Sequence, residues 1–201
     1  MGKIQEITIW ATGVLQDKEA RDVALCLATA ANQEGKFTQA FDNYVDLPDR
    51  VNVPLRKYAR ISDSEIEEKY QYENDHPEIV VVMEEAIVKG MNILRGMPKG
   101  GTLVVNTARK PEDILKFIPN KDILSKIVCV DAKKIAPKTV IDFTGSEGGV
   151  DAVGFGKGLG AVIAGATAKA TGCVKIDSLK ASVANPAAAE RGFAEAVVKT
   201  L

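Results

Sequence analysis

Glu78-Ile79-Val80-Val81-Val82-Met83 is an unbroken apolar run behind a single acidic residue. Runs without alternation are typical of central strands that are buried on both faces of a parallel sheet. Similar runs follow at 102–106 and 127–131, separated by one predicted helix that ends near Arg95 and another that opens at Pro111. Strands that alternate with helices in this way predict an α/β fold with a largely parallel sheet flanked by helices.

The rest of the chain extends this pattern at both ends. The remaining predicted elements are strands at 4–10, 37–44 and 53–61, helices at 18–32 and 132–137, and a helical tail from 158 to 201 that is broken near Gly172 and Asn185-Pro186. Gly35 stands where a helix usually has its C-terminal cap.

Composition narrows the class of protein. The chain has 201 residues and a net charge of −1, which suits one well-filled domain and gives no basis for nucleic-acid binding. We expect no membrane association, because no stretch reaches the roughly 18 apolar residues that span a bilayer. Residues 1–6 lack the apolar core of a secretory signal, so we expect a cytoplasmic protein.

The three cysteines, Cys26, Cys129 and Cys173, lie far apart in apolar runs. Iron–sulfur clusters usually need four thiolates, several of them closely spaced, and zinc sites need paired Cys or His ligands. The only histidine, His76, lies in a polar stretch and reads as a surface residue. We therefore expect buried structural thiols and no metal.

The loop after the first strand, residues 11–19, contains one glycine, Gly13. A phosphate at this position of an α/β sheet needs several closely approaching backbone N–H groups. Asp17 and Glu19 would instead cap the following helix and repel an anion. A structural turn is favoured over an anion site.

A second glycine cluster, from residue 145 to Gly160, includes Gly156-Lys157-Gly158-Leu159-Gly160-Ala161. This stretch fits a variant of the dinucleotide fingerprint, although it does not follow the first strand. Either its N–H groups and Lys157 hold a phosphate, or its glycines let a helix pack closely against a neighbour. Farther back in the chain, Arg56, Lys57 and Arg60 bracket a predicted strand and read as an exposed edge.

Five phrases occur in a fixed order: 35–41 (Gly-Lys-Phe-Thr-Gln-Ala-Phe), 60–63 (Arg-Ile-Ser-Asp), 100–107, 130–135 and 168–172 (Ala-Lys-Ala-Thr-Gly). Their order resembles the gamma subunit, or gamma domain, of the 2-oxoacid:ferredoxin oxidoreductases. The resemblance implies a single Rossmann-like gamma-type domain over residues 1–201. It also implies an accessory subunit of an enzyme that oxidatively decarboxylates a 2-oxoacid.

The same resemblance places the cofactors elsewhere. Thiamine diphosphate and [4Fe–4S] clusters would lie on alpha, beta and delta-type subunits, with ferredoxin or another acceptor taking the electrons and no catalytic residue on this chain. Lys36 would face the cofactor cleft and meet a phosphate, unless it serves only the nearby helix end. Arg50 would contact a neighbouring subunit or the active site, unless its loop is simply solvated. Gly156, Lys157 and Gly158 complete the predicted cofactor-binding residues.

Two departures from the family pattern concern coenzyme A. Family members usually carry a Gly-x-Gly-Gly-x-Gly loop after the first strand, and nothing in residues 11–19 matches it. No asparagine lies near Leu159-Gly160-Ala161, where the family often has one. Either the parent enzyme has a weakened or absent coenzyme A requirement, as with an oxalate-type substrate, or partner chains hold the coenzyme. A solitary nucleotide-binding module using residues 154–161 is the alternative from another class.

Overall fold

The computed structural model describes residues 2–43, 53–136 and 155–201. Within them a seven-stranded sheet has the order β2-β3-β1-β4-β5-β6-β7. The strands are β1 (Ile4–Thr12), β2 (Phe37–Asp42), β3 (Pro54–Ser62), β4 (Ile79–Val82), β5 (Gly101–Asn106), β6 (Leu124–Val130) and β7 (Val197–Thr200). The predicted α/β class is confirmed.

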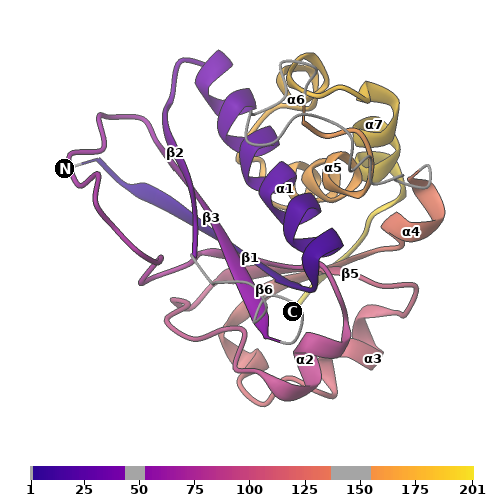
Figure 1. The fold of residues 1–201 in the computed structure, drawn as a ribbon. Helices are drawn as coiled ribbons and strands as arrows, with labels where there is room; N and C mark the ends of the chain where they lie inside the picture. The colour runs from indigo at the N-terminus through magenta and orange to yellow at the C-terminus, as the bar shows by residue number, and fades with distance from the viewer. Residues whose placement is uncertain (1, 44–52, 137–154) are drawn as a thin grey trace.

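Helices cover both faces of this sheet (Figure 1). They are α1 (Val14–Gln33), α2 (Ala86–Gly90), α3 (Pro111–Leu115), α4 (Ala132–Ile135), α5 (Leu159–Thr171), α6 (Ile176–Ser182) and α7 (Pro186–Glu195), with a short 3-10 turn at Lys121–Ile123. Gly35 follows α1 with a φ of +81°, a left-handed conformation that favours glycine, as expected of a helix C-terminus.

Two hydrophobic clusters separate the faces. The larger one packs α1 and α5 against residues such as Ile7, Ile9 and Val81, and most of its helix contacts are alanines. The smaller one packs α2 and α3 against Val80, Val82 and Leu103. Alternate residues of β4 therefore enter opposite clusters, which explains why its sequence is apolar at every position.

The sheet is parallel only at its centre. β1, β4, β5 and β6 pair in parallel, whereas β3 pairs antiparallel with both β1 and β2, and β7 pairs antiparallel with β6. The tail was predicted to be wholly helical, so β7 corrects that prediction. Its four residues, Val197–Thr200, are too few to show a strand period, and they are held by their pairing with β6.

The helix predicted to extend to Arg95 is also shorter than expected. It spans only Ala86–Gly90, and Met91 leaves the helix with extended φ and ψ. Ile93, Leu94 and Met97 then enter the smaller cluster from a non-helical segment. Burial in this cluster, rather than helical propensity, decides the local backbone there. In the part of the chain that the structure describes, no helix is long and apolar enough to span a membrane.

Candidate functional site at the carboxyl edge of the sheet

The carboxyl ends of β1, β4, β5 and β6 lie along one edge of the sheet, because these strands are parallel. After β1 the chain enters α1 on one face, and after β4 it enters α2 on the other. Ligands of open α/β sheets bind beyond the carboxyl ends at such a reversal. The residues that follow β1 and β4 therefore form the candidate site.

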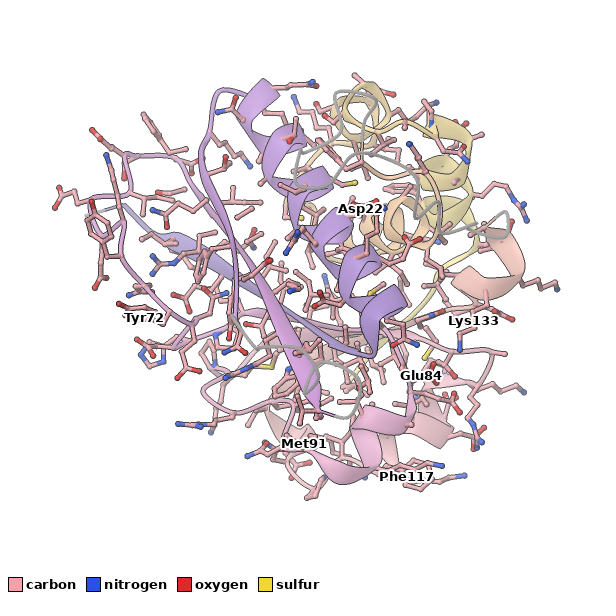
Figure 2. All side chains as sticks on the ribbon, in the orientation of Figure 1. Asp22, Tyr72, Glu84, Met91, Phe117 and Lys133 are labelled. Atoms are coloured by element: carbon pink, nitrogen blue, oxygen red, sulfur yellow. The ribbon has the colours of Figure 1, made fainter. Side chains whose placement is uncertain are left out.

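Glu84, directly after β4, is the centre of this edge. Its Oε2 accepts hydrogen bonds from Gln16 Nε2 at 2.9 Å and from Lys133 Nζ at 2.8 Å. These partners come from α1 and α4, so one carboxylate joins three segments of the edge. Figure 2 shows Glu84 and Lys133 on the same side of the molecule, where their side chains form an ion pair.

Glu85 forms a second group one residue further on. Its carboxylate accepts hydrogen bonds from the Thr107 hydroxyl and, at 3.0 Å, from Arg109 Nε. The Thr107 hydrogen bond, supported by Arg109, lowers the pKa of Glu85. Glu85 is therefore an ionised acceptor at neutral pH and does not serve as a proton donor.

Asn106 makes this edge rigid. Its Nδ2 donates to the carbonyl oxygen of Met83 and its Oδ1 accepts from the N–H of Ala132, both at 3.0 Å. The side chain is buried, and both of its polar ends are used. It therefore fixes the ends of β4, β5 and β6 relative to one another.

The turn after β1 is bonded by a side chain of the helix that follows it. Gln16 Oε1 accepts a long hydrogen bond of 3.4 Å from the N–H of Thr12, and Gly13 has a φ of +82°. The prediction that Asp17 and Glu19 cap α1 is wrong. The helix begins earlier, at Val14, and no side chain caps it at Gly13.

Asp17 instead binds Lys57, whose Nζ lies 2.7 Å from Asp17 Oδ1. The Lys57 side chain is only 2% exposed and Arg60, paired with Glu6 at 3.1 Å, only 3%. The prediction of an exposed basic edge is therefore wrong for both residues. It failed because β3 lies between β2 and β1, so its charged side chains are buried and must be paired.

The glycine segment before α5 lies against α1. The N–H of Gly156 donates to Asp22 Oδ2 at 2.9 Å, and the N–H of Gly160 donates to Glu19 Oε2 at 2.7 Å. These backbone donors are the kind that would hold a phosphate, and two carboxylates of the same chain receive them. Burial raises the pKa of Asp22 to about 6, against the opposing effect of the Gly156 hydrogen bond.

The glycines also allow close packing. A Cβ on Gly156 would lie 2.8 Å from Cys26 Sγ, and one on Gly160 would lie 2.7 Å from Asp22 Cβ. Gly158 is buried and Lys157 is exposed. Contacts of this kind suit the packing interpretation of the segment, while phosphate binding by Gly156, Lys157 and Gly158 stays a prediction.

Lys36 lies at the other end of α5. Its Nζ donates to the carbonyl oxygen of Cys173 at 3.1 Å and lies 3.9 Å from Glu34 Oε2. The neighbouring Phe37 is level with the start of β1, because both are in register with Ser62. Lys36 is therefore separated from the carboxyl edge, and its predicted contact with a cofactor stays a prediction. Arg50 lies outside the described residues.

The sequence interpretation missed Gln16, Glu84 and Lys133. The available signal was the occurrence of polar residues shortly after predicted strands. Asp131 proves to be the N-cap of α4, with its side chain accepting from the N–H of Lys134.

The three cysteines do not suit metal or cluster binding. Cys26, Cys129 and Cys173 are all buried, as predicted, and none forms a disulfide. Burial raises the pKa of each thiol, that of Cys129 to about 12. Among the described residues, no three His, Cys, Asp or Glu side chains come together as metal ligands.

Comparison with known proteins agrees with this architecture. The family model described as "Pyruvate ferredoxin/flavodoxin oxidoreductase" matches residues 23–201. The common gamma subunit of the pyruvate/ketoisovalerate oxidoreductases of Thermococcus kodakarensis is 32% identical over 187 residues, which cover 87% of this chain and 89% of that protein.

Solved structures show the same fold. The pyruvate oxidoreductase subunit PORC of Thermotoga maritima has a TM-score of 0.70 at 25% identity, covering 98% of this chain and 99% of that one. A 2-oxoglutarate:ferredoxin oxidoreductase from Magnetococcus marinus, with 2-oxoglutarate, coenzyme A and succinyl-CoA bound, has a TM-score of 0.54 at 13% identity. This likeness concerns the fold alone and covers 96% of this chain and 31% of that one. The chain belongs to the pyruvate ferredoxin/flavodoxin oxidoreductase family, as a gamma-type subunit of a ketoacid oxidoreductase.

Proposed function

We propose that this chain is the accessory gamma subunit of an enzyme that oxidatively decarboxylates a 2-oxoacid. Thiamine diphosphate and [4Fe–4S] clusters would be held by alpha, beta and delta-type partner subunits, and ferredoxin or another acceptor would take the electrons. Family membership supports this assignment. Among the described residues the buried cysteines belong to no group of metal ligands, which supports placing the redox centres on the partner chains.

The carboxyl edge supports a role in shaping the active site. Glu84 and Glu85 are held by partners from several elements, and Asn106 fixes the strands beneath them. A rigid, charged edge of this kind can position a neighbouring subunit or a polar substrate. The paired carboxylates and cations make it a positioning surface, with the chemistry carried out on the partner subunits.

We further propose that the parent enzyme has a weakened or absent coenzyme A requirement. The observation that carries this proposal is that Asp22 and Glu19 receive the N–H groups of Gly156 and Gly160. A coenzyme A phosphate in this position would have to displace two carboxylates that repel it. The loop after β1 offers one glycine, and Gln16 already bonds the N–H of Thr12.

An oxalate-type substrate fits such an enzyme chemically. Cleavage of the carbon–carbon bond of oxalate releases two molecules of carbon dioxide and two electrons. No acyl group remains, so no thiol acceptor is needed. With pyruvate, by contrast, the two-carbon unit left on thiamine diphosphate needs an acceptor.

The experiment is to purify the complex that contains this chain without oxygen and to measure acceptor reduction with oxalate and with pyruvate. Both substrates are tested with and without coenzyme A, and coenzyme A binding is measured by equilibrium dialysis. We expect oxalate-dependent reduction that does not change when coenzyme A is added. Tight coenzyme A binding by the intact complex would contradict this proposal.

If the enzyme does use coenzyme A, a variant can show whether this chain or a partner chain binds it. Lys157→Ala leaves the KM for coenzyme A unchanged when the partner chains hold the coenzyme, and raises it when this chain does. Lys157 is exposed, so the change should not disturb folding. The occupied N–H groups of Gly156 and Gly160 also argue against a solitary nucleotide-binding module.

A further inference from the structure

The segment between β3 and β4, residues 63–78, contains no helix or strand. Connections of this length without secondary structure are uncommon in compact domains and usually have a function. We call this segment the strap. Tyr72, in the middle of the strap, lies away from Glu84 and Lys133 in Figure 2.

Several contacts hold the strap in place. Ile66 is 4% exposed, so it anchors the first half in the protein. The carbonyl oxygen of Glu68 accepts from Arg60 Nη1 at 3.3 Å and from Gln39 Nε2 at 3.4 Å. Asn74 Nδ2 donates to the carbonyl oxygen of Ile7 at 3.0 Å. The strap is therefore attached to β1, β2 and β3 along its length.

Two tyrosines extend from this anchored segment. Tyr70 is 94% exposed and Tyr72 is 89% exposed, the highest values among the exposed large hydrophobic side chains of the described residues. Large aromatic side chains on a fixed backbone bind a partner at low entropic cost, and tyrosine is enriched at the energetic centres of interfaces. Neither tyrosine side chain has a hydrogen bond or ring contact with another described residue.

Charge indicates the kind of partner. The strap has seven acidic residues and one lysine, a net charge of −6, whereas the whole chain has −1 and the remainder therefore +5. The acidic side chains most open to solvent around the tyrosines include Glu65, Glu67 and Glu68. Only Glu65 among these three has an ion-pair partner within the described residues, Lys69 at 3.4 Å. A complementary surface would carry Lys or Arg.

The base of the strap also borders a cavity of about 410 Å³, lined by residues that include Trp10, Arg56, Glu73 and Asn74. Arg56 spans it, with Nη1 at 2.6 Å from Glu73 Oε2 and its guanidinium carbon 5.4 Å from the centroid of the Trp10 ring. Trp10 and Asn74 are each 8% exposed.

Trp10 Nε1 and Asn74 Oδ1 have no hydrogen-bond partner among the described residues. Both atoms are shielded from solvent, so a docked segment does not reach them without rearrangement of the site.

We propose that the strap forms a docking site for an extended, basic segment of another protein subunit. Lys or Arg side chains of that segment face Glu65, Glu67 and Glu68, and its apolar parts pack on Tyr70 and Tyr72. The proposal rests on the proposed function, because it takes the partner to be a subunit of the same oxidoreductase.

Photocrosslinking tests the position of the contact. Benzoylphenylalanine is introduced at Tyr72 in the intact complex, and at Phe117 on another part of the surface as a control (Figure 2). We expect the Tyr72 probe to link to a lysine- or arginine-rich segment of another subunit. A complex of verified composition with no link from position 72, or with a link to a second copy of this chain or to an acidic segment, would overturn the proposal.

Charge reversal tests the chemistry of the contact. Glu65→Lys, Glu67→Lys and Glu68→Lys together should weaken association with the partner subunits by about tenfold or more at low salt, and less at high salt. The matched control reverses three exposed acidic residues of α6 and α7, Asp177, Glu190 and Glu195, and should change association less than about twofold. Equal effects of the two triple variants would overturn the proposal. A chain that purifies without any partner would instead overturn the proposed function.

Discussion

The carboxylate of Asp22 on α1 accepts a hydrogen bond from the backbone N–H of Gly156 at 2.9 Å, across 134 residues of sequence. This contact joins the first helix to the glycine segment that precedes α5. It also brings an acidic group into surroundings where burial raises its pKa from 3.8 to about 6.

The raised pKa of Asp22 predicts an unusual pH dependence of stability. The folded protein binds the Asp22 proton more tightly than the unfolded chain does. This contribution to the free energy of unfolding is therefore complete below about pH 4 and lost as the pH rises to about 6. A shift of roughly two pK units corresponds to at most about 3 kcal/mol, and less here because the carboxyl is partly exposed.

Asp22→Asn should remove this dependence, because the amide oxygen can still accept from Gly156 without being ionised. Chemical denaturation of both proteins between pH 4 and pH 7 measures it. The variant should gain stability relative to the parent protein as the pH rises. Asp177→Asn on an exposed turn of α6 is the control, and a gain that does not vary with pH would contradict the assignment.

We expect the buried Lys57–Asp17 pair to show a large coupling energy in the free energy of unfolding. Lys57→Met should destabilise the protein by about 3–5 kcal/mol, because it removes a buried cation that pairs with Asp17. Adding Asp17→Leu should recover most of this loss. Denaturant titration of both single variants and the double variant measures the coupling, and additive effects would show that the pair is not coupled.

The crossing of α5 and α7 depends on two glycines. A Cβ on Gly165 would lie 2.0 Å from the carbonyl oxygen of Ala189, and one on Gly192 would lie 2.0 Å from that of Val162. Gly192→Ala should therefore destabilise the protein by about 3 kcal/mol. Gly90→Ala, at a helical position where a Cβ meets nothing within 4 Å, should stabilise it by about 0.5–1 kcal/mol. Equal thermal shifts in the two variants would refute this.

A variant of the Glu84–Lys133 pair can test the function of the carboxyl edge with little effect on stability. Lys133 is 61% exposed, so Lys133→Gln should change the free energy of unfolding by less than about 1 kcal/mol. If the carboxyl edge shapes the active site, the same change should lower kcat/KM of the intact complex about tenfold. Lys116→Gln, which breaks an exposed pair on another part of the surface, should leave kcat/KM unchanged. Unchanged kcat/KM in the Lys133 variant would exclude this edge.

The sequence predicts the central strands well, because a strand buried on both faces must be apolar at every position, as Ile79–Val82 is. It also locates Gly35 and Gly172, whose positive φ favours glycine, and the break at Asn185, whose side chain caps α7. β7 is not predicted, because its four residues are too few to show a strand period and are held by pairing with β6.

The sequence does not predict the ion-pair and hydrogen-bond partners of the charged residues. Lys57 and Arg60 look exposed until the antiparallel return of β3 between β1 and β2 buries them. Glu19 was predicted to cap the first helix, yet Glu19 and Asp22 accept hydrogen bonds from N–H groups of a segment more than 130 residues later. Such contacts depend on the tertiary fold and lie far apart along the chain.

The most direct test is to purify this chain from its native host without oxygen and to identify what accompanies it. The proposed function predicts a complex of several subunits that contains thiamine diphosphate, iron and sulfide and reduces an acceptor when given a 2-oxoacid. A lone, colourless monomer that binds a nucleotide unaided would contradict it.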